Sequence, residues 1–337
     1  MHQTKIEYAD RAWNPITGCL KDCKYCDYKK RVNSFSGDIR RNKGMVDKYI
    51  LDDELYILNE MYIDNNNPFG FEPTYHRYRA SALDTLKTPM NVAVSHNGEM
   101  FGPWIKDEYI KEIFDITAKY PRQRFLFLTA YPERYEELYK KGILPDGDNY
   151  WYGWSVTSGK ADYNPDFKGG HKYIVIEPIL DKVTSITAGI EWVIVGADKK
   201  KYKGRITPEN EWIDYIVSDC VKKNIPLFME SSIEKYVSAV YKMYPIQLSR
   251  TEYSDKKKML YEADCNMCNK HLLKRKMATF TVSYERGHFT KSIGFLCDDC
   301  YKKICEEYGF EYFKRERRDK SGKDKKLSSD TGTEGNT

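Results

Sequence analysis

Between residues 90 and 232, short apolar runs alternate with segments whose apolar side chains recur at helical spacing. The runs are mostly continuous rather than alternating, as expected for parallel strands buried on both faces. The six strands that this pattern predicts are residues 90–95, 124–129, 152–156, 172–177, 192–196 and 226–229. Alternation of such strands with helices predicts an α/β fold. We expect a TIM-like barrel, complete or partial, with a doubly wound open sheet as the alternative.

Three helices are predicted between these strands. Residues 104–119 and 208–223 each place their apolar side chains on one helical face. Thr207 offers a capping hydroxyl just before the second of these helices. Residues 132–142 begin with proline and end with glycine, which is typical of a helix. Cys220 falls on the apolar face of its helix, so we interpret it as a core residue.

The alternation stops near residue 236, which divides the chain into parts. Residues 1–235 are predicted to form the barrel. Residues 27–88 within it are rich in asparagine, tyrosine and charge, and are predicted to be a helical insertion. Residues 236–313 are predicted to form a small separate module, and residues 314–337 a disordered tail.

The net charge of +5 comes from the predicted tail. Residues 314–326 contain eight basic and three acidic side chains, so the rest of the chain is neutral. Such a tail either contacts nucleic acid non-specifically or only keeps the protein soluble.

Composition and cysteine content limit the class of protein. Hydrophobic residues make up 41% of the chain, enough for a core. No apolar run approaches the roughly 18 residues that a bilayer crossing needs, and the first residues contain no apolar signal-peptide core. We therefore expect a soluble cytoplasmic protein with no membrane partner, in which the nine cysteines favour metal ligands over disulfides.

Four cysteines in the C-terminal module form two C-x2-C pairs. Cys265 and Cys268 are separated by 28 residues from Cys297 and Cys300, with a hairpin-like strand over residues 278–288 between them. Two such pairs joined by β-structure are typical of a zinc ribbon, in which four thiolates bind a structural Zn²⁺ ion. The alternative is two unrelated thiol groups. Three nearby residues close enough in sequence to replace a ligand are His271, His288 and Cys305.

The same module contains a basic stretch. Residues 256–276 carry seven basic side chains against two acidic ones. Such a stretch beside a zinc ribbon suits contact with a phosphate backbone, although it is also typical of an ordinary solvated surface.

Three cysteines near the N-terminus carry the strongest chemical signal. Cys19, Cys23 and Cys26 have the spacing C-x3-C-x2-C. Three thiolates can bind three irons of a [4Fe–4S] cluster and leave the fourth iron open. The alternative is a zinc site completed by His2, Asp27 or a distant histidine.

This spacing, with the aromatic Tyr25 just before the third cysteine, resembles the signature of radical S-adenosylmethionine (SAM) enzymes. The resemblance implies that SAM fills the open iron position and is cleaved reductively to a 5′-deoxyadenosyl radical. It also implies that Tyr25 packs near the adenine of SAM.

Further segments resemble a phage-associated three-cysteine family of unknown function. That family is similar to radical SAM proteins, with spore photoproduct lyase the nearest characterised type. The segments that carry the resemblance are residues 4–8, 13–19, 127–129, 132–134, 153–156, 176–180, 192–196 and 225–229. They occur in the order of the family, so the resemblance implies a radical SAM barrel over residues 4–232.

The chain departs from the family pattern at four places. Ala130-Tyr131, Thr157, Ala197-Asp198 and Glu230 stand where the family tends to have other residues. All four follow predicted strands, where barrel enzymes carry out their chemistry. The cluster and the fold are therefore implied by the resemblance, but the substrate is not.

Polar residues at the ends of the strands are the candidates for binding and catalysis. The expected residues of the barrel mouth are His96, Asn97, Thr129, Tyr131, Ser155, Thr157, Glu177, Asp198 and Glu230. We expect SAM to be bound by Tyr25, Ser95, Asn97, Ser155 and Glu177. The resemblance implies that Tyr25 and residues 95–97 lie where such enzymes bind SAM, and Ser155 and Glu177 offer the hydroxyl and carboxylate partners that its ammonium and ribose groups need. We expect catalytic roles for His96, Tyr131 and Glu230. The alternative for Glu177 is a buried pair with a basic residue.

The main hypothesis is a radical SAM enzyme with a [4Fe–4S] cluster, SAM and a structural zinc ion. Its substrate is expected to be nucleic acid or a nucleotide, and its electron donor a protein such as flavodoxin or ferredoxin. The alternatives are a non-enzymatic iron–sulfur or zinc protein that binds nucleic acid, and a radical SAM enzyme that modifies peptides or proteins.

Overall fold

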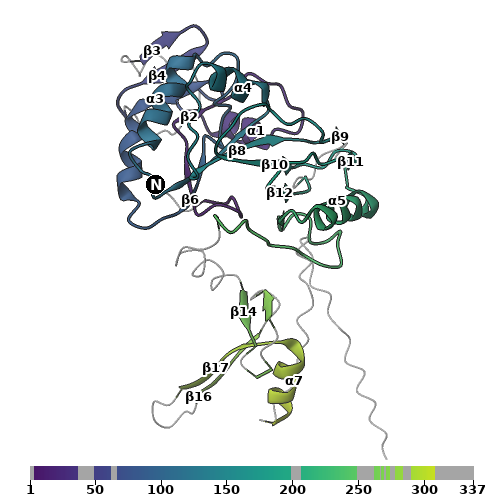
Figure 1. Cartoon of the computed structure of the whole chain (residues 1–337). Helices are drawn as coiled ribbons and strands as arrows, with labels where there is room; N and C mark the ends of the chain where they lie inside the picture. The colour runs from purple at the N-terminus through teal and green to yellow at the C-terminus, as the bar shows by residue number, and fades with distance from the viewer. Residues whose placement is uncertain are drawn as a thin grey trace, which may run out of the picture. The chain divides into compact units, whose positions relative to one another are not determined.

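The computed structural model describes most of the chain. The described residues are 4–36, 49–61, 67–198, 206–248, 262–265, 267–268, 271–273, 278–283 and 290–307. The chain divides into two compact units, residues 1–254 and 255–337 (Figure 1). The predicted tail over residues 314–337 lies outside the described residues, and so do the seven basic side chains of the stretch 256–276.

A seven-stranded parallel sheet forms the centre of the first unit (Figure 1). In spatial order its strands are β1 (Arg11–Trp13), β6 (Asn91–Val94), β7 (Arg124–Thr129), β8 (Tyr150–Ser155), β10 (His171–Ile176), β12 (Trp192–Val195) and β13 (Leu227–Met229). All six neighbouring pairs are parallel. The spatial order follows the chain order, so each strand is added on the same side of the one before it. A doubly wound sheet would reverse that direction.

The two faces of this sheet are covered differently. Helices α3 (Asp107–Thr117), α4 (Glu133–Lys140) and α5 (Asn210–Lys223) contribute buried side chains to the same core cluster, which includes Phe127, Ile176 and Val195. Alternate strand residues form a second cluster on the other face, where Tyr8 and Leu248 pack. Helices on one face and a curled parallel sheet define a half-barrel, so the partial form of the predicted barrel is the one observed.

The six predicted strands are confirmed, and their continuous apolar runs explain why. Each run buries side chains on both faces, as parallel strands between two cores require. Strand β1 is not among these six, because three residues are too short to show a pattern. A small parallel pair, β9 (Gly159–Lys160) and β11 (Val183–Thr184), lies in the loops that follow β8 and β10.

The predicted helical insertion over residues 27–88 is wrong for most of its described residues. It contains helix α1 (Asp27–Phe35) and the 3-10 helix η1 (Arg77–Thr85). It also contains three strands of a four-stranded sheet, whose order is β2 (Ile16–Thr17), β5 (Thr74–His76), β4 (Leu55–Leu58) and β3 (Tyr49–Asp52), with turns and loops between them. The four residues of β4 are all buried, and the turn before it places Asp53 at a φ of 52°. Such a run is long enough for a buried strand and too short for a helix.

Residues after 235 also belong to the first unit. The backbone N–H of Met229 donates to the carbonyl of Tyr241 (2.8 Å), which extends the sheet beyond β13. The indole of Trp192 donates to the carbonyl of Met243 (3.0 Å). These contacts explain why the unit reaches residue 254 rather than the expected boundary at 235.

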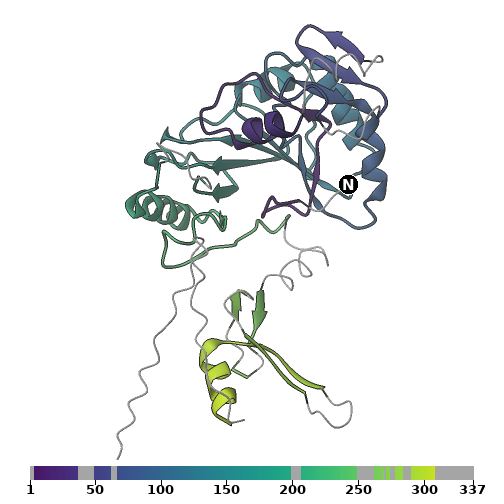
Figure 2. The same ribbon diagram turned by 180° about the vertical axis from the view of Figure 1, so that it is seen from behind.

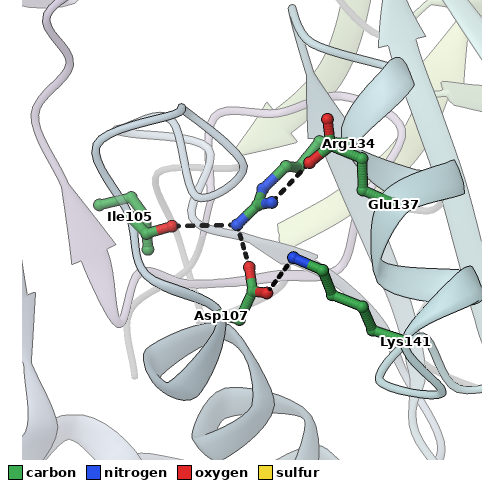
Figure 3. Close-up of polar contacts among 5 residues, drawn as sticks. All are labelled: Ile105, Asp107, Arg134, Glu137 and Lys141. Atoms are coloured by element: carbon green, nitrogen blue, oxygen red, sulfur yellow. Dashed lines mark hydrogen bonds and ion pairs between the residues drawn. The ribbon is translucent and has the colours of Figure 1, made fainter.

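An ion-pair network joins the starts of α3 and α4 (Figure 3). The Arg134 guanidinium donates to the carbonyl of Ile105 (3.3 Å) and to the carboxylates of Asp107 and Glu137. Lys141 also contacts Asp107 (2.6 Å). Partial burial favours the neutral acid, but Lys141 and Arg134 hold the pKa of Asp107 below its usual value. Arg134 belongs to a segment that resembles the family, and here it acts as a structural brace.

Replacing Arg134 with alanine is expected to destabilise the first unit by about 2 kcal/mol. The substitution removes the guanidinium that donates hydrogen bonds to the Ile105 carbonyl and to the carboxylates of Asp107 and Glu137. The control is Lys111→Ala, which removes an exposed pair with Asp115 (2.7 Å) and should change stability by less than about 0.5 kcal/mol. Urea unfolding measures both variants. Equal losses of unfolding free energy in the two variants would contradict this structural role of Arg134.

The second unit is built from two antiparallel pairs and one helix. Strand β14 (Glu262–Asp264) pairs with β15 (His271–Leu273), and β16 (Ala278–Ser283) pairs with β17 (Thr290–Leu296). Helix α7 (Asp298–Glu307) follows β17 directly. The predicted strand between the cysteine pairs is therefore present as β16.

In the part of the chain that the structure describes, no helix has the length and apolar character that a membrane crossing needs.

Candidate functional site

The three-cysteine loop lies at the edge of the half-barrel where the strands end. It follows β2, and its Gly18 N–H donates to the carbonyl of Asn97, just beyond β6 (3.1 Å). The Glu99 N–H donates back to the carbonyl of Gly18 (3.0 Å). Gly18 has a φ of 80°, and a Cβ there would lie 2.2 Å from the carbonyl oxygen of Glu72, so only glycine fits. Because parallel strands end at one edge of a sheet, these contacts bring the loop to the barrel mouth.

Backbone N–H groups are directed at two of the thiols. The Lys21 N–H donates to Cys19 Sγ (3.3 Å), and the Lys29 N–H donates to Cys26 Sγ (3.4 Å). Cys26 is thereby the N-cap of α1. Hydrogen bonds of this kind stabilise sulfur ligands in metal centres and tune their reduction potential.

The charge state of these thiols depends on what binds them. Burial raises the pKa of Cys19 to about 12, and Glu99 and the thiols of Cys23 and Cys26 add to the shift. A thiol must lose its proton to bind a metal, and the positive charge of the metal compensates for that loss. The same interactions show that the three thiols and Glu99 lie close enough to influence each other.

The three sulfurs of the loop do not lie as close together as the four thiols of the second unit do. Tetrahedral thiolates bound at about 2.3 Å to one Zn²⁺ ion lie about 3.8 Å apart. Among the described residues, Cys19, Cys23 and Cys26 do not form a group that converges on one ion in this way. In a [4Fe–4S] cluster each thiolate binds a different iron, so the thiolates are farther apart.

Tyr25 and Tyr131 place the loop against β7 and β8. The Tyr25 hydroxyl hydrogen-bonds with the side chain of Thr157, and burial and Cys23 raise its pKa to about 12. The Lys21 ammonium lies 5.0 Å from the centre of the Tyr131 ring. Burial raises the pKa of Tyr131 as well, with contributions from Cys19, Glu99 and Cys23. The structure therefore brings two expected mouth residues, Tyr131 and Thr157, up to the cysteine loop.

Glu99 is a site residue that the sequence reasoning missed. Its buried carboxylate accepts hydrogen bonds from Thr129 Oγ1 (2.7 Å), the Ala130 N–H (2.9 Å) and the Phe101 N–H (3.2 Å). Burial raises the pKa of Glu99 despite these donors. The sequence could have indicated it, because Glu99 is an acidic residue shortly after a predicted strand and directly before the apolar pair Met100-Phe101. Glu99 therefore links the loop after β6 to the end of β7. The Thr129 hydroxyl donates one of the hydrogen bonds that form this link.

The residues after β6 lie in different environments. Ser95 is buried with a φ of 49°, and its hydroxyl accepts a hydrogen bond from the Ile16 N–H (3.2 Å). The Asn97 N–H donates to Asn14 Oδ1 (3.1 Å). His96 is exposed, with its ring 6.4 Å from that of Tyr8. The Ser95 hydroxyl thus braces β2, while His96 faces solvent at the mouth.

A second group of predicted residues lies beyond β10, β12 and β13. Glu177 packs over Gly196, where a Cβ would lie 2.9 Å from its carboxyl carbon. Glu230 and Asp198 follow β13 and β12 and are both buried. Burial raises the pKa of Tyr8, and Tyr173, Glu230 and Glu177 add to the shift. Tyr8 therefore lies near both glutamates. The side of the mouth that carries Glu177, Asp198 and Glu230 is called the acidic side below.

Ser155 ends β8 and is half-buried. It lies two residues before Thr157, on the strand between the cysteine side of the mouth and the acidic side. The structure thus collects the predicted site residues at one edge of the sheet but distributes them between these two sides.

The second unit contains a group of four cysteines that could bind a metal ion. The Sγ atoms of Cys265, Cys268, Cys297 and Cys300 all lie within 4.8 Å of one another. The Sγ atoms of Cys268 and Cys297 are 3.6 Å apart, and the Cys297 N–H donates to Cys265 Sγ (3.3 Å). Cys305 is buried on α7 and is not part of the group. The side chain of His271 and all of His288 lie outside the described residues, as does His2.

The fold and the site define an α/β half-barrel protein with a three-cysteine loop at its carboxyl edge. A family model described as "Protein of unknown function (DUF5131)" matches residues 3–281, and the chain belongs to this family. No curated protein matches the chain.

Solved structures of spore photoproduct lyase are similar to the chain at low level. One is a double mutant of the lyase with bound AdoMet and dinucleoside spore photoproduct, at 11% identity and a TM-score of 0.34, covering 91% of this chain and 73% of the lyase. Another is the lyase complexed with dinucleoside spore photoproduct, at 11% identity and a TM-score of 0.35, covering 90% and 73%. Similarity this distant does not assign a function.

Proposed function

We propose that this protein is a radical SAM enzyme in which Cys19, Cys23 and Cys26 bind a [4Fe–4S] cluster. The observation that carries the proposal is the C-x3-C-x2-C loop at the carboxyl edge of a parallel half-barrel. Three thiolates leave one iron open for a ligand. Two N–H···S hydrogen bonds and the half-buried position of the thiols suit a cluster that must be shielded from solvent.

When bound, the cluster supplies the electron that cleaves SAM. The chain positions SAM and excludes water. Tyr25 lies over the loop toward Thr157, where it can pack against the adenine. Glu177 offers a carboxylate to the ammonium or ribose of SAM, together with Asn97 and Ser155. Ser95 contributes by holding β2, and with it the start of the loop.

His96, Tyr131 and Glu230 are the proposed catalytic residues. Tyr131 lies on the cysteine side of the mouth, with its ring edge against Trp104 (5.7 Å between centroids). His96 and Glu230 lie on the acidic side, around Tyr8. A substrate between the two sides could exchange protons or hydrogen atoms with these groups.

The proposed substrate is nucleic acid or a nucleotide. The proposal rests on the basic residues of the stretch 256–276 and of the tail, which suit phosphate contacts. The rivals are a non-enzymatic nucleic-acid-binding protein and a peptide-modifying enzyme. Affinities of the full chain for single-stranded DNA, RNA and peptides at several salt concentrations would separate them.

We also propose that the four-cysteine group binds one structural Zn²⁺ ion. The 3.6 Å between two of its sulfurs matches the spacing of about 3.8 Å expected around a single ion bound at about 2.3 Å. Four thiolates leave no open position, so this ion would stabilise the second unit and take no part in chemistry.

The reaction can be tested by the products of SAM. Anaerobic protein that carries the cluster is expected to release 5′-deoxyadenosine and methionine from SAM when dithionite supplies electrons. Protein that carries the cluster but releases neither product would contradict the proposed function.

Replacing Glu177 with glutamine is expected to weaken SAM binding about 10-fold or more, because a charged hydrogen bond contributes about 1.5–3 kcal/mol. The iron content should not change. The control is Glu191→Gln, which alters a carboxylate next to His171 (2.8 Å) at the amino end of β12. Equilibrium dialysis with SAM compares the two. Equal SAM affinities of the two variants would show that Glu177 does not bind SAM.

A further inference from the structure

We infer that the outer side of the cysteine loop and α1 form the docking surface for an acidic protein that donates electrons. This inference rests on the proposed function, which requires an electron from outside the chain. The surface, here called the α1 surface, consists of Leu20, Lys24, Lys30, Arg31 and Phe35. All five are exposed. Helix α1 is the dark purple coil of Figure 2.

Charge is concentrated on this surface. Residues 20–36 contain five basic and two acidic side chains, a net charge of +3 in a chain that is neutral overall outside its tail. One of the five, Lys21, lies against Tyr131 at the mouth and not on this surface. Asp22 compensates one of the five through its contact with Lys29 (2.8 Å). Lys24, Lys30 and Arg31 are the exposed cations of the surface. A basic surface attracts an acidic partner and accelerates their encounter at low salt.

Apolar side chains on the same surface favour a protein partner over a nucleic acid. Phe35 is 81% exposed and Leu20 is 38% exposed. A pocket of about 180 Å³ lies beside Phe35 and is lined by Tyr28, Arg31, Val32, Phe35, Ser36 and Asn67. The Arg31 guanidinium lies 5.2 Å from the centre of the Tyr28 ring. Aromatic residues and arginine around a pocket are typical of the energetic centre of a protein–protein interface.

The α1 surface also adjoins the cysteine loop. Leu20 and Lys24 each follow a cysteine of the loop, and Cys26 caps α1 through the Lys29 N–H. The other side of the loop faces Thr157 and Tyr131 at the mouth, where SAM and the substrate are proposed to lie. A donor on α1 therefore reaches the cluster without crossing the mouth. In this step one electron leaves the donor and reduces the cluster, and no bond forms or breaks.

The test compares two double variants with the same change in charge. Lys24→Glu/Lys30→Glu alters the α1 surface. The control Lys119→Glu/Lys222→Glu alters exposed residues at the amino edge of the sheet, after α3 and at the end of α5. Reduced flavodoxin, an acidic one-electron donor, is mixed anaerobically with full-length protein that carries the cluster. The reduction rate is measured from low to high salt, and dithionite-driven SAM cleavage is measured in parallel.

The α1 variant is expected to be reduced by flavodoxin at least about 10-fold more slowly at low salt, and to lose most of its salt dependence. Its dithionite-driven SAM cleavage should stay within about twofold of the unmodified protein, as should both rates of the control. Equal flavodoxin rates for the two variants would overturn the inference and leave the proposed function intact. An unchanged flavodoxin rate with lost affinity for single-stranded DNA would assign the surface to nucleic acid and also overturn it. Absence of any cluster would overturn the proposed function itself.

Discussion

The Cys23→Ala variant is expected to lose its iron–sulfur cluster and with it all reductive cleavage of SAM. Each of the three thiolates binds a different iron, so two thiolates no longer retain the cluster. Iron should fall from about four atoms per chain to below about one. The effect should be much larger than that of removing a neighbouring hydrogen bond, which costs roughly 10- to 100-fold in metal affinity.

Cys220→Ala is the matched control for this variant. Cys220 is buried in the core on α5, so its loss should cost about 1 kcal/mol of stability and no iron. Iron analysis and the visible absorbance of anaerobically reconstituted protein compare the two. Equal iron in Cys23→Ala and in the unmodified protein would contradict the assignment of Cys23 as a ligand.

Removal of the proposed Zn²⁺ ion is expected to unfold the second unit and to leave the first unit folded. Structural Zn²⁺ contributes about 10–16 kcal/mol to the folding of small modules. Cys268 is exposed, and an exposed residue without a ligand role would change stability by only about 0.5 kcal/mol when replaced. Cys268→Ser should therefore have a large effect only if Cys268 binds a metal. We expect loss of zinc and of amide-exchange protection in β16 and β17.

Cys305→Ala tests whether the effect is specific to the metal. Cys305 is buried in the same unit but lies outside the four-cysteine group. Its variant should keep one zinc ion per chain while losing a little stability. Zinc content of the full chain, measured for both variants, decides between the two roles. A Cys268→Ser protein that kept both its zinc and its exchange protection would contradict the proposed site.

The parts of the fold that the sequence predicted are those with local signals. Continuous apolar runs identified six strands of the half-barrel, because each is buried on both faces. The C-x2-C pairs depend on spacing alone, and the structure brings their sulfurs together. The insertion was misjudged because its composition outweighed a buried run of only four residues, Leu55–Leu58.

The site was predicted at the level of strand ends but not of side-chain direction. Ser95 follows β6 as expected, but the sequence did not indicate its φ of 49° or the hydrogen bond that its hydroxyl accepts from the Ile16 N–H. Glu99 was missed because its three donors come from residues that lie beyond it in the chain, two of them at the end of β7. Tertiary contacts decide such details, and local sequence patterns do not contain them.

The central claim is that one iron of an N-terminal cluster is open to SAM. Electron paramagnetic resonance of the dithionite-reduced, anaerobically reconstituted full chain, with and without SAM, tests it most directly. We predict a four-iron signal that shifts when SAM is added and is absent in Cys23→Ala. A protein without that signal, or with one that SAM leaves unchanged, would contradict the account and favour a binding protein without radical chemistry.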